Sequence, residues 1–193
     1  MVSAASMPFI AFRDYVRDEQ TRAIKHEWLD GGVYAMAGGT PEHGALAMAV
    51  SNLLGAQLKG KKCRLFSSDV RIRVTATGLA TYPDLSIVCG SLQTDPEDAN
   101  SIVNPSVIVE VLSPSTESYD RSKKFAHYKQ IETLQHYVVV AHDQPYIEWF
   151  TRAPASAGAG VWLHRAAGPS ETVALTAIEC ELTVDDVYFD PLA

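Results

Sequence analysis

Two acidic side chains stand at the edges of strongly apolar segments in this chain. Asp84 follows Pro83 in TYPDLSIVC, and Glu110 lies in SVIVEVLSPS. Burying an unpaired charge is costly, so a carboxylate in such a position calls for a partner. Two carboxylates on adjacent strands can share a divalent cation, because hard cations prefer oxygen ligands. The pair therefore indicates a metal site.

In a metal-dependent nuclease, Asp84 and Glu110 would bind Mg²⁺ or Mn²⁺, with the backbone carbonyl of Val111 as a third protein ligand. The metal would lower the pKa of a bound water and neutralise the charge that builds on a phosphodiester. A nearby lysine would orient that water or stabilise the transition state. A purely structural alternative stays open, in which Asp84 caps a strand and Glu110 pairs with a basic residue.

Four further residues are weaker candidates for the same site. Glu42 and His43 begin a helix, where an acid interacts favourably with the helix N-terminus whatever its function. Asp69 lies between two strands and would be either a third acid or a turn residue. Tyr128 would hydrogen-bond the site or simply pack in the core. The remaining histidines show no metal-ligand spacing, which argues against a zinc site.

The first elements that must position these residues are marked by turn and capping signals. Apolar segments at residues 23–29 and 33–36 flank Asp30-Gly31-Gly32. This favours a hairpin, because Asp-Gly supplies the positive φ angles of a tight turn. Thr40-Pro41-Glu42 then begins a helix that runs to about Leu58. Threonine suits the cap, proline suits the first turn, and apolar residues recur at helical spacing.

The rest of the chain is expected to consist mostly of strands. Four strand segments are predicted at residues 63–66, 70–74, 80–89 and 107–112, and the polar residues 93–104 are predicted to form a loop. A helix over residues 118–132 and a buried strand at 137–141 follow. The remaining elements are a short helix at 9–19, an outer hairpin at 146–151 and 161–165, and weaker strands at 173–175 and 180–182. This order predicts an α/β fold with a mixed sheet.

Length and composition fit a single domain over residues 1–193 with a proper core, since 47% of the residues are apolar. Residues 1–7 do not resemble a signal peptide, and no apolar run approaches the roughly 20 residues of a membrane span. We therefore expect a cytoplasmic protein with no membrane partner. The net charge of −7 disfavours a nucleic-acid coat protein but not an enzyme that touches nucleic acid locally. The cysteines Cys63, Cys89 and Cys180 form no CxxC pair, and we expect them to be unpaired, buried residues.

Taken together, the motifs resemble the Uma-two family of predicted bacterial restriction endonucleases. The segments DGGVYAMAGGTPEH, YPDLSIVCG, VIVEVLSPST and YDRSKKFAHYKQ carry the resemblance, which runs from about His26 to Ala141. The family falls within the restriction-endonuclease-like superfamily, whose site is written PD-(D/E)xK. The resemblance implies an α-β-β-β-α-β core with a mixed sheet and added β-hairpins at both ends. It also implies a Mg²⁺- or Mn²⁺-dependent hydrolase that acts on DNA.

One position departs from the superfamily pattern. The lysine expected two residues after Glu110 is replaced by Leu112. The family resembles nucleases in which this lysine has moved to the following helix, and Lys124 is the better substitute because it borders the inward face of that helix. Lys123, about 100° round the helix, is the competitor. The alternative for Lys124 is a surface ion pair with Asp120 at i,i+4 spacing, which would contribute only tenths of a kcal/mol.

Three functions compete for these residues. The first is a metal-dependent endonuclease that cleaves DNA, with Asp84, Glu110 and Lys124 as catalytic residues. The second is a catalytically inactive nuclease-fold protein that binds nucleic acid or a protein partner, which Leu112 and the acidic net charge favour. The third, a glycosidase that uses the two acids, is disfavoured because no aromatic residues cluster around them. Nucleases of this fold often dimerise, so a homodimer or higher homo-oligomer is compatible with the sequence.

Overall fold

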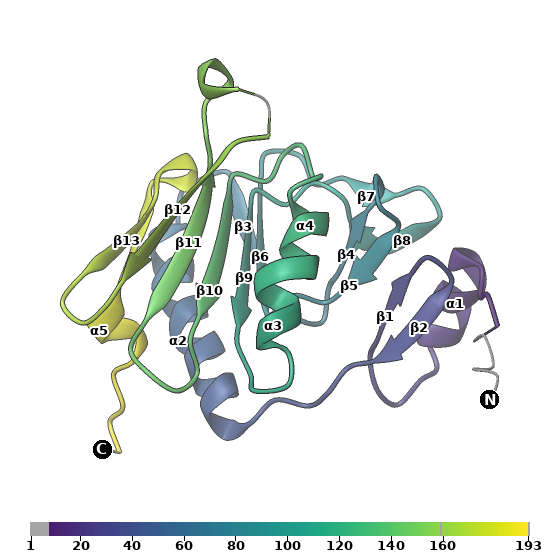
Figure 1. Cartoon of the computed structure of the whole chain (residues 1–193), viewed down its shortest axis with the longest axis horizontal. Coiled ribbons are helices and arrows are strands. Elements are labelled where there is room, and N and C mark those ends of the chain that lie inside the picture. The colour runs from purple at the N-terminus through teal and green to yellow at the C-terminus, as the bar shows by residue number, and fades with distance from the viewer. Residues whose placement is uncertain (1–7, 159, 193) are drawn as a thin grey trace, which may run out of the picture.

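The computed structural model describes residues 8–158 and 160–192 as two six-stranded sheets, a two-stranded hairpin and several helices (Figure 1). The expectation about a signal peptide at residues 1–7 lies outside the described residues. Within residues 8–158 and 160–192, no helix combines the length and the apolar character that a membrane crossing requires.

The central sheet contains Glu110 and follows the predicted order of elements. Its strands, in spatial order, are β12 (Trp162–Ala167), β11 (Ile147–Arg152), β10 (His136–Val140), β9 (Val107–Val111), β6 (Leu85–Cys89) and β3 (Cys63–Ser67). β9 and β10 run parallel and the other neighbours antiparallel, so the sheet is mixed. Helix α2 (Pro41–Gln57) precedes β3, and a helical segment lies between β9 and β10. Within this sheet the chain order is α2, β3, β6, β9, the helical segment and β10, but four strands of the other sheet come between β3 and β9.

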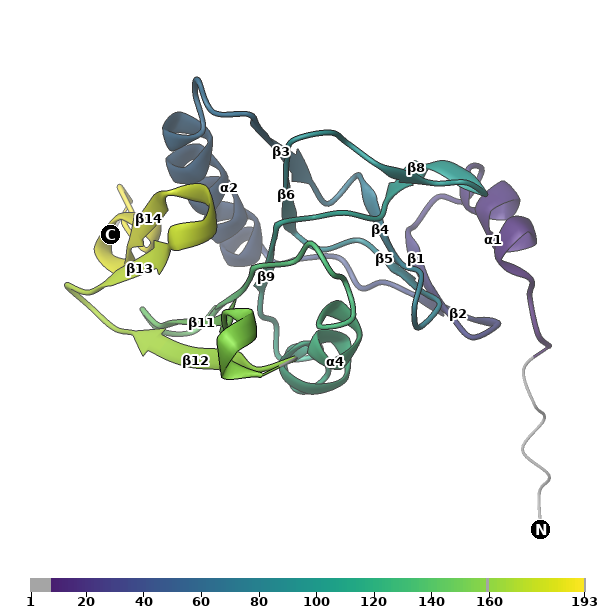
Figure 2. The ribbon, with the colours of Figure 1, turned by 90° about the horizontal axis from the view of Figure 1, so that it is seen from above.

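Helices cover both faces of the central sheet, as the view from above shows (Figure 2). The segment after β9 consists of α3 (Glu117–Tyr119), a π-helical turn (Asp120–Lys124) and α4 (Phe125–Tyr128). Alternation along β9 turns its three valines toward α2. The same alternation turns Ile108 and Glu110 toward the second helical segment. Because successive side chains of β9 point to opposite faces of the sheet, Glu110 faces the second helical segment and not α2.

The second sheet holds the N-terminal part of the chain. Its strands, in spatial order, are β2 (Gly32–Ala35), β1 (His26–Leu29), β5 (Leu79–Thr81), β4 (Arg71–Val74), β8 (Asp98–Ile102) and β7 (Thr94–Asp95). The helix α1 (Phe12–Glu19) packs on β1 through Phe12 and Trp28. Asp30 and Gly31 have φ angles of 49° and 85°, which confirms the predicted tight turn between β1 and β2.

The predicted strand at residues 80–89 and the predicted loop at residues 93–104 are wrong. The strands also form two mixed sheets, where the sequence predicted one. Residues 80–89 were expected as one strand, but β5 pairs with β4 in the second sheet, whereas β6 pairs with β3 and β9 in the central sheet. The chain changes sheet at Tyr82-Pro83-Asp84, where proline provides no backbone donor. Residues 93–104 form β7 and β8 instead of a loop, because β8 finds a parallel partner in β4.

The cysteines also differ from expectation. Strands β3 and β6 pair antiparallel with Cys63 directly opposite Cys89, and these two residues form a disulfide across a sequence separation of 26 residues. Only Cys180 is a free cysteine among the described residues, and it is buried. Strand register, which sequence spacing does not reveal, brings the pair together.

The C-terminal part contains the two predicted weaker strands, which pair as a hairpin, and a final helical turn, and it packs beside α2. It consists of β13 (Thr172–Leu175), β14 (Cys180–Thr183) and α5 (Val184–Val187), with short 3₁₀ turns at Ala155–Ala157 and Thr176–Ile178. The side-chain amide of Gln57 donates to the carbonyl of Glu181 at 2.7 Å and accepts from its N–H at 2.9 Å. These bonds tie the end of α2 to β14.

Candidate active site

Asp84 lies where the chain enters the central sheet. Its Oδ2 accepts a hydrogen bond of 2.7 Å from the backbone N–H of Val111. The Nε2 of His43 lies 3.2 Å from the same oxygen, and the Asp84 side chain is 15% exposed. The bond from the end of β9 therefore holds the Asp84 carboxylate beside the residue that follows Glu110.

Glu110 is a buried carboxylate with two partners on the second helical segment. The hydroxyl of Tyr128 donates to its Oε1 at 2.8 Å, and Nζ of Lys124 lies 2.9 Å from the same atom. Burial raises the pKa of Glu110 to about 8, although the Lys124 ammonium opposes this rise. Asp120 and Asp84 raise the pKa further, because they add negative charge nearby.

Lys124 is the lysine that reaches Glu110. Its Nζ lies 3.3 Å from Oδ1 of Asp120 and 3.4 Å from Oε1 of Glu27, in addition to its contact with Glu110. Burial alone would favour the neutral amine, but these carboxylates hold the pKa of Lys124 well above its ordinary value. The Asp120–Lys124 pair considered from the sequence does exist, but both residues are buried, so it is not a surface pair.

A π-helical turn presents Lys124 and Asp120 inward. Residues Asp120–Lys124 follow a π-helical course between the short α-helices α3 and α4. Such single turns widen the helix locally and are frequent at functional sites. The hydroxyl of Tyr137 in β10 donates to the carbonyl of Asp120 at 3.0 Å and fixes the turn against the central sheet. Lys123, one position earlier, is exposed and makes no ion pair with any described residue.

Glu27 was not among the residues predicted for the site. It lies in β1, and its Oε1 accepts a hydrogen bond from Thr81 of β5 and contacts Lys124. The signal in the sequence was weak, since Glu27 is one charged residue beside the buried Trp28 in a hairpin strand. Its position depends on how the β1–β2 hairpin docks, and this is a tertiary property.

His43 is held in place by the start of α2. Thr40 caps the helix, and its Oγ1 accepts from the backbone N–H of His43 at 3.2 Å. A Cβ at Gly39 would lie 2.7 Å from Nδ1 of His43, so only glycine leaves room for the ring there. The hydrogen bond with Asp84 raises the pKa of His43 above its ordinary value, against the effect of burial.

These residues line one pocket of about 580 Å³, which we call the site pocket. Three carboxylates, His43, the two lysines of the helical segment and the apolar end of β2 all face this pocket. Its lining includes Glu27, Leu29, Tyr34, Met36, His43, Asp84, Glu110, Val111, Tyr119, Lys123 and Lys124. The structure thus places Asp84, Glu110, Val111, Lys123, Lys124 and His43 together, with Tyr128 bonded to Glu110 from behind.

The donor set of the site pocket fits a hard cation. Oδ1 of Asp84 and Oε2 of Glu110 make no hydrogen bond with the described residues, and neither is among the buried polar atoms that lack a partner. Both oxygens therefore retain access to the pocket. No cluster of three or more His, Cys, Asp or Glu side chains suited to a metal occurs in the described ranges. Any cation here would therefore depend on the two carboxylates, backbone oxygen and water, as Mg²⁺ commonly does.

Two of the weaker candidates do not join this site. Glu42 is exposed at the start of α2 and does not line the site pocket. Asp69 pairs with Lys25, whose Nζ lies 2.6 Å from Oδ1 of Asp69, and lines a different pocket. An acid at a helix start and an acid in a turn therefore follow their ordinary structural explanations, at a distance from Glu110.

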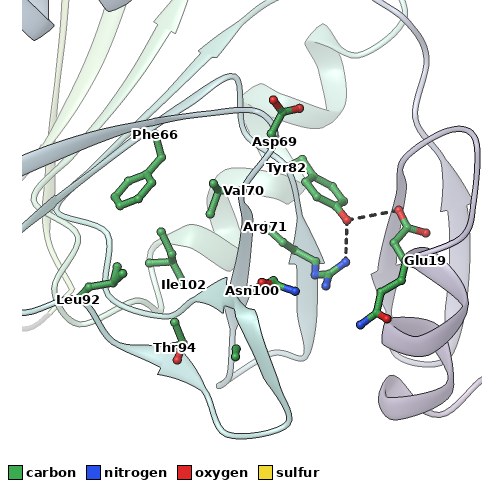
Figure 3. A pocket seen from close by; sticks show the side chains of 12 residues that line it. Glu19, Phe66, Asp69, Val70, Arg71, Tyr82, Leu92, Thr94, Asn100 and Ile102 are labelled. Carbon is green, nitrogen blue, oxygen red and sulfur yellow. Dashed lines mark hydrogen bonds between the residues drawn. The ribbon is translucent and has the colours of Figure 1, made fainter.

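That second pocket has a volume of about 370 Å³ and is drawn in Figure 3. Its inner wall is a polar network in which Arg71 donates to the hydroxyl of Tyr82 at 2.6 Å, and Tyr82 lies 3.4 Å from Glu19 (Figure 3). The other guanidinium nitrogens of Arg71 also donate: Nε bonds Asp98 and Ser101, and Nη2 bonds Asp98. Because every nitrogen of Arg71 already bonds a partner in this network, we assign it a structural role in the second sheet.

Comparisons with known proteins point to one family. Residues 12–185 match the family described as "Uma2: Putative restriction endonuclease". The "Uncharacterized protein slr1290" of Synechocystis sp. is 34% identical over 188 residues, which cover 96% of this chain and 94% of that protein. The "Uncharacterized protein sll1609" of the same organism is 27% identical over 140 residues, covering 72% and 79% respectively.

A solved structure shares the fold. The crystal structure of "a putative nuclease belonging to DUF820" from Anabaena variabilis superposes with a TM-score of 0.74 and 16% identity. The match covers 93% of this chain and 98% of that chain. At this identity the likeness establishes a common architecture, whereas roles of individual residues have to come from the site pocket itself.

Proposed function

We propose that this chain, which belongs to the Uma2 family, is a metal-dependent endonuclease that hydrolyses phosphodiester bonds in DNA. The observation that carries the proposal is the approach of Lys124 Nζ to Glu110 Oε1 at 2.9 Å in the pocket that Asp84 also lines. Two carboxylates and a lysine are the groups that the PD-(D/E)xK pattern requires. Here the lysine comes from the helical segment, which agrees with Leu112 occupying its usual place.

In this proposal Asp84 and Glu110 would hold Mg²⁺ or Mn²⁺ through their unbonded oxygens, and the carbonyl of Val111 would be a further ligand. The ion would supply an activated water and neutralise charge on the phosphodiester. His43 and the backbone N–H of Val111 hold Oδ2 of Asp84, so they orient Oδ1 toward the pocket. Tyr128 has the same effect on Glu110.

Lys124 acts as a charged hydrogen-bond donor. Its pKa lies well above the ordinary value for lysine, so it stays protonated at neutral pH and does not accept the proton of the attacking water. A buried and fixed positive charge would stabilise the charge that develops on the phosphoryl oxygens. Asp120 and Glu27 keep the ammonium in place.

Cleavage of plasmid DNA in Mg²⁺ or Mn²⁺ by the purified protein tests the proposal. We expect the wild type to cleave and Asp84→Ala and Glu110→Gln to lose at least about 100-fold in rate, since each removes a metal ligand. Glu42→Gln is the matched control, because it neutralises an acid of the same region that does not line the site pocket.

Two results would count against the proposal. Equal cleavage by the wild type and Asp84→Ala would identify a contaminating nuclease. Absence of cleavage by the wild type, together with unchanged calorimetric Mn²⁺ binding in Glu110→Gln, would remove both the activity and the site.

A catalytically inactive nuclease-fold protein is the second candidate. The buried cluster of Lys124 with Glu27, Glu110 and Asp120 favours it, because losing one partner of these ion pairs would leave a buried charge, which is a reason to keep them in a protein that performs no chemistry. Calorimetric titration with Mn²⁺ separates the two candidates. Binding that disappears in Glu110→Gln supports the nuclease, whereas DNA binding without any metal uptake supports the inactive protein.

A further inference from the structure

The β1–β2 hairpin presents one of its faces to the site pocket. Its register pairs Glu27 with Tyr34 and Leu29 with Gly32, so these four residues lie on the same face. Trp28 lies on the opposite face and packs against α1. Since Glu27 reaches Lys124, the side chain of Tyr34 is directed to the same pocket.

The hairpin contributes an apolar wall beside the carboxylates, formed by Leu29, Tyr34 and Met36. We call it the hairpin wall. Tyr34 is 49% exposed, so a large part of it is free to contact a ligand. A Cβ at Gly32 would lie only 2.5 Å from the Tyr34 hydroxyl, which means that the ring lies over Gly32 and uses the space of the missing side chain.

The lining of the site pocket offers few positive charges, so phosphate contacts alone would give it little affinity for a duplex. Tight binding to double-stranded DNA depends on neutralising many phosphates with lysine and arginine. The lining of the site pocket contains three carboxylates and one exposed cation, Lys123, because Lys124 is buried and paired. The exposed basic residues Lys62 and Arg64 line a separate pocket at the β3 edge.

We infer that the hairpin wall takes an unpaired base of single-stranded DNA while the adjoining phosphate contacts Lys123 and the cation that the carboxylates would hold, an inference that rests on the proposed function. Aromatic side chains bind single strands by stacking on base faces, and these faces are covered in a duplex. A pocket of about 580 Å³ falls within the range that holds a molecule the size of a nucleotide. Tyr34 therefore selects the substrate class, and the carboxylates perform the reaction.

Equilibrium fluorescence anisotropy with the full chain tests this inference. The probes are a labelled strand of about 12 nucleotides and the duplex of the same sequence. Ca²⁺ replaces the reactive metal, and the integrity of the oligonucleotides is checked on a gel. We expect the single strand to bind at least about tenfold tighter than the duplex, because only the strand offers open base faces.

The variants locate the effect on Tyr34. Tyr34→Ala should weaken binding of the single strand about tenfold and leave the duplex unchanged, whereas Tyr34→Phe keeps the stacking ring and should stay within about twofold of the wild type. Phe189→Ala removes another exposed aromatic ring, outside the site pocket, and should have no effect. Thermal unfolding of each variant checks that the fold is intact.

Equal or tighter binding of the duplex would overturn the inference, and so would a Tyr34→Ala protein that binds the strand like the wild type. Cleavage assays on the same oligonucleotides separate this result from the proposed function. A preference for single strands without cleavage supports the inference and contradicts the nuclease. Cleavage of strand and duplex at the same rate contradicts the inference alone.

Discussion

At the residue scale, one ammonium group is surrounded by carboxylates from three separate parts of the chain. Lys124 contacts Glu27 of β1, Glu110 of β9 and Asp120 of its own helical turn. With Asp84 these acids outnumber the two lysines of the site pocket, Lys123 and Lys124, and this surplus of acidic groups is one reason why the pKa of Glu110 is raised. Such an excess attracts a cation and explains why both unbonded carboxylate oxygens are suited to a metal.

Replacing Lys124 by methionine tests its role. Lys124→Met keeps most of the side-chain volume but removes the charge, and we expect the cleavage rate to fall by about 10²–10³-fold, the usual effect of losing a group that stabilises the transition state. The same change should lower stability, because Glu110 is then buried without its cation. Single-turnover cleavage and urea denaturation measure the two effects.

Lys123→Met is the matched control for this experiment. Lys123 has the same charge and lines the same pocket, but it is exposed and makes no ion pair within the described ranges. We expect a KM increase of a few-fold and an unchanged kcat, since it meets the phosphate without entering the reaction. Equal loss of kcat in both variants would contradict the distinction between the two lysines.

At the element scale, the site depends on where strands begin and end. The bond from Val111 N–H to Asp84 ties the end of β9 to the start of β6. The alternation of β9 and the π-helical turn then bring Glu110 and Lys124 face to face. A second junction of this kind joins the central sheet to the C-terminal hairpin through His136, the first residue of β10.

His136 makes the stability of this junction depend on pH. Ala177 N–H donates to its Nε2 at 3.1 Å, and Nδ1 lies 3.1 Å from Oγ1 of Thr151. The ring is therefore neutral, with its proton on Nδ1, and burial lowers the pKa of His136 to about 4. Between pH 6.5 and 4 the unfolded chain binds a proton that the folded chain does not, so stability falls as the pH falls.

We expect this effect to reach about 2–3 kcal/mol at the acid end of that range. Urea denaturation at a series of pH values measures it. The variant His136→Gln can still donate to Thr151 and accept from Ala177 without titrating, so its stability should change less over the same range. An identical pH dependence in the two proteins would show that His136 does not titrate in this way.

At the scale of the whole molecule, a single covalent bond joins an edge strand to the interior of the central sheet. The disulfide between Cys63 and Cys89 closes a loop with a sequence separation of 26 residues. Loop-closure entropy for this length corresponds to about 3.5 kcal/mol of stability. Neither cysteine lines the site pocket. We therefore expect reduction to lower the free energy of unfolding by about this amount and to leave cleavage unchanged.

Thiol titration and urea denaturation, with and without reductant, check this prediction. The denatured but unreduced protein should show one reactive thiol, that of Cys180, and the reduced protein three. Cys180→Ser serves as the control, because it should respond to reductant as the wild type does. Three thiols before reduction would mean that the bond does not form in solution.

Local patterns predicted the features that neighbouring residues determine. The tight turn at Asp30-Gly31, the cap of α2 and the inward position of Lys124 follow from turn chemistry and helical spacing. The prediction of one strand over residues 80–89 failed because strands of two different sheets follow each other there, with only Tyr82-Pro83-Asp84 between them. The continuous apolar run concealed that change of partner.

Features set by docking and register could not be predicted in this way. Glu27 meets Lys124 only because the β1–β2 hairpin folds onto β5, and the disulfide depends on the register of β3 against β6. Glu42 and Asp69 were weaker candidates with a structural alternative each, and neither lines the site pocket. The distances between elements, and not the motifs, decide which acids share the pocket.

A crystal soaked in Mn²⁺ tests the central claim most directly, by anomalous scattering. We predict one strong peak in the site pocket, at about 2.0–2.6 Å from an oxygen of Asp84 and an oxygen of Glu110, the range of oxygen bonds to such cations. The peak should disappear in Glu110→Gln crystals and persist in Glu42→Gln crystals. An empty pocket at saturating Mn²⁺, or a peak bound only by other residues, would contradict the claim that these two carboxylates hold the catalytic metal.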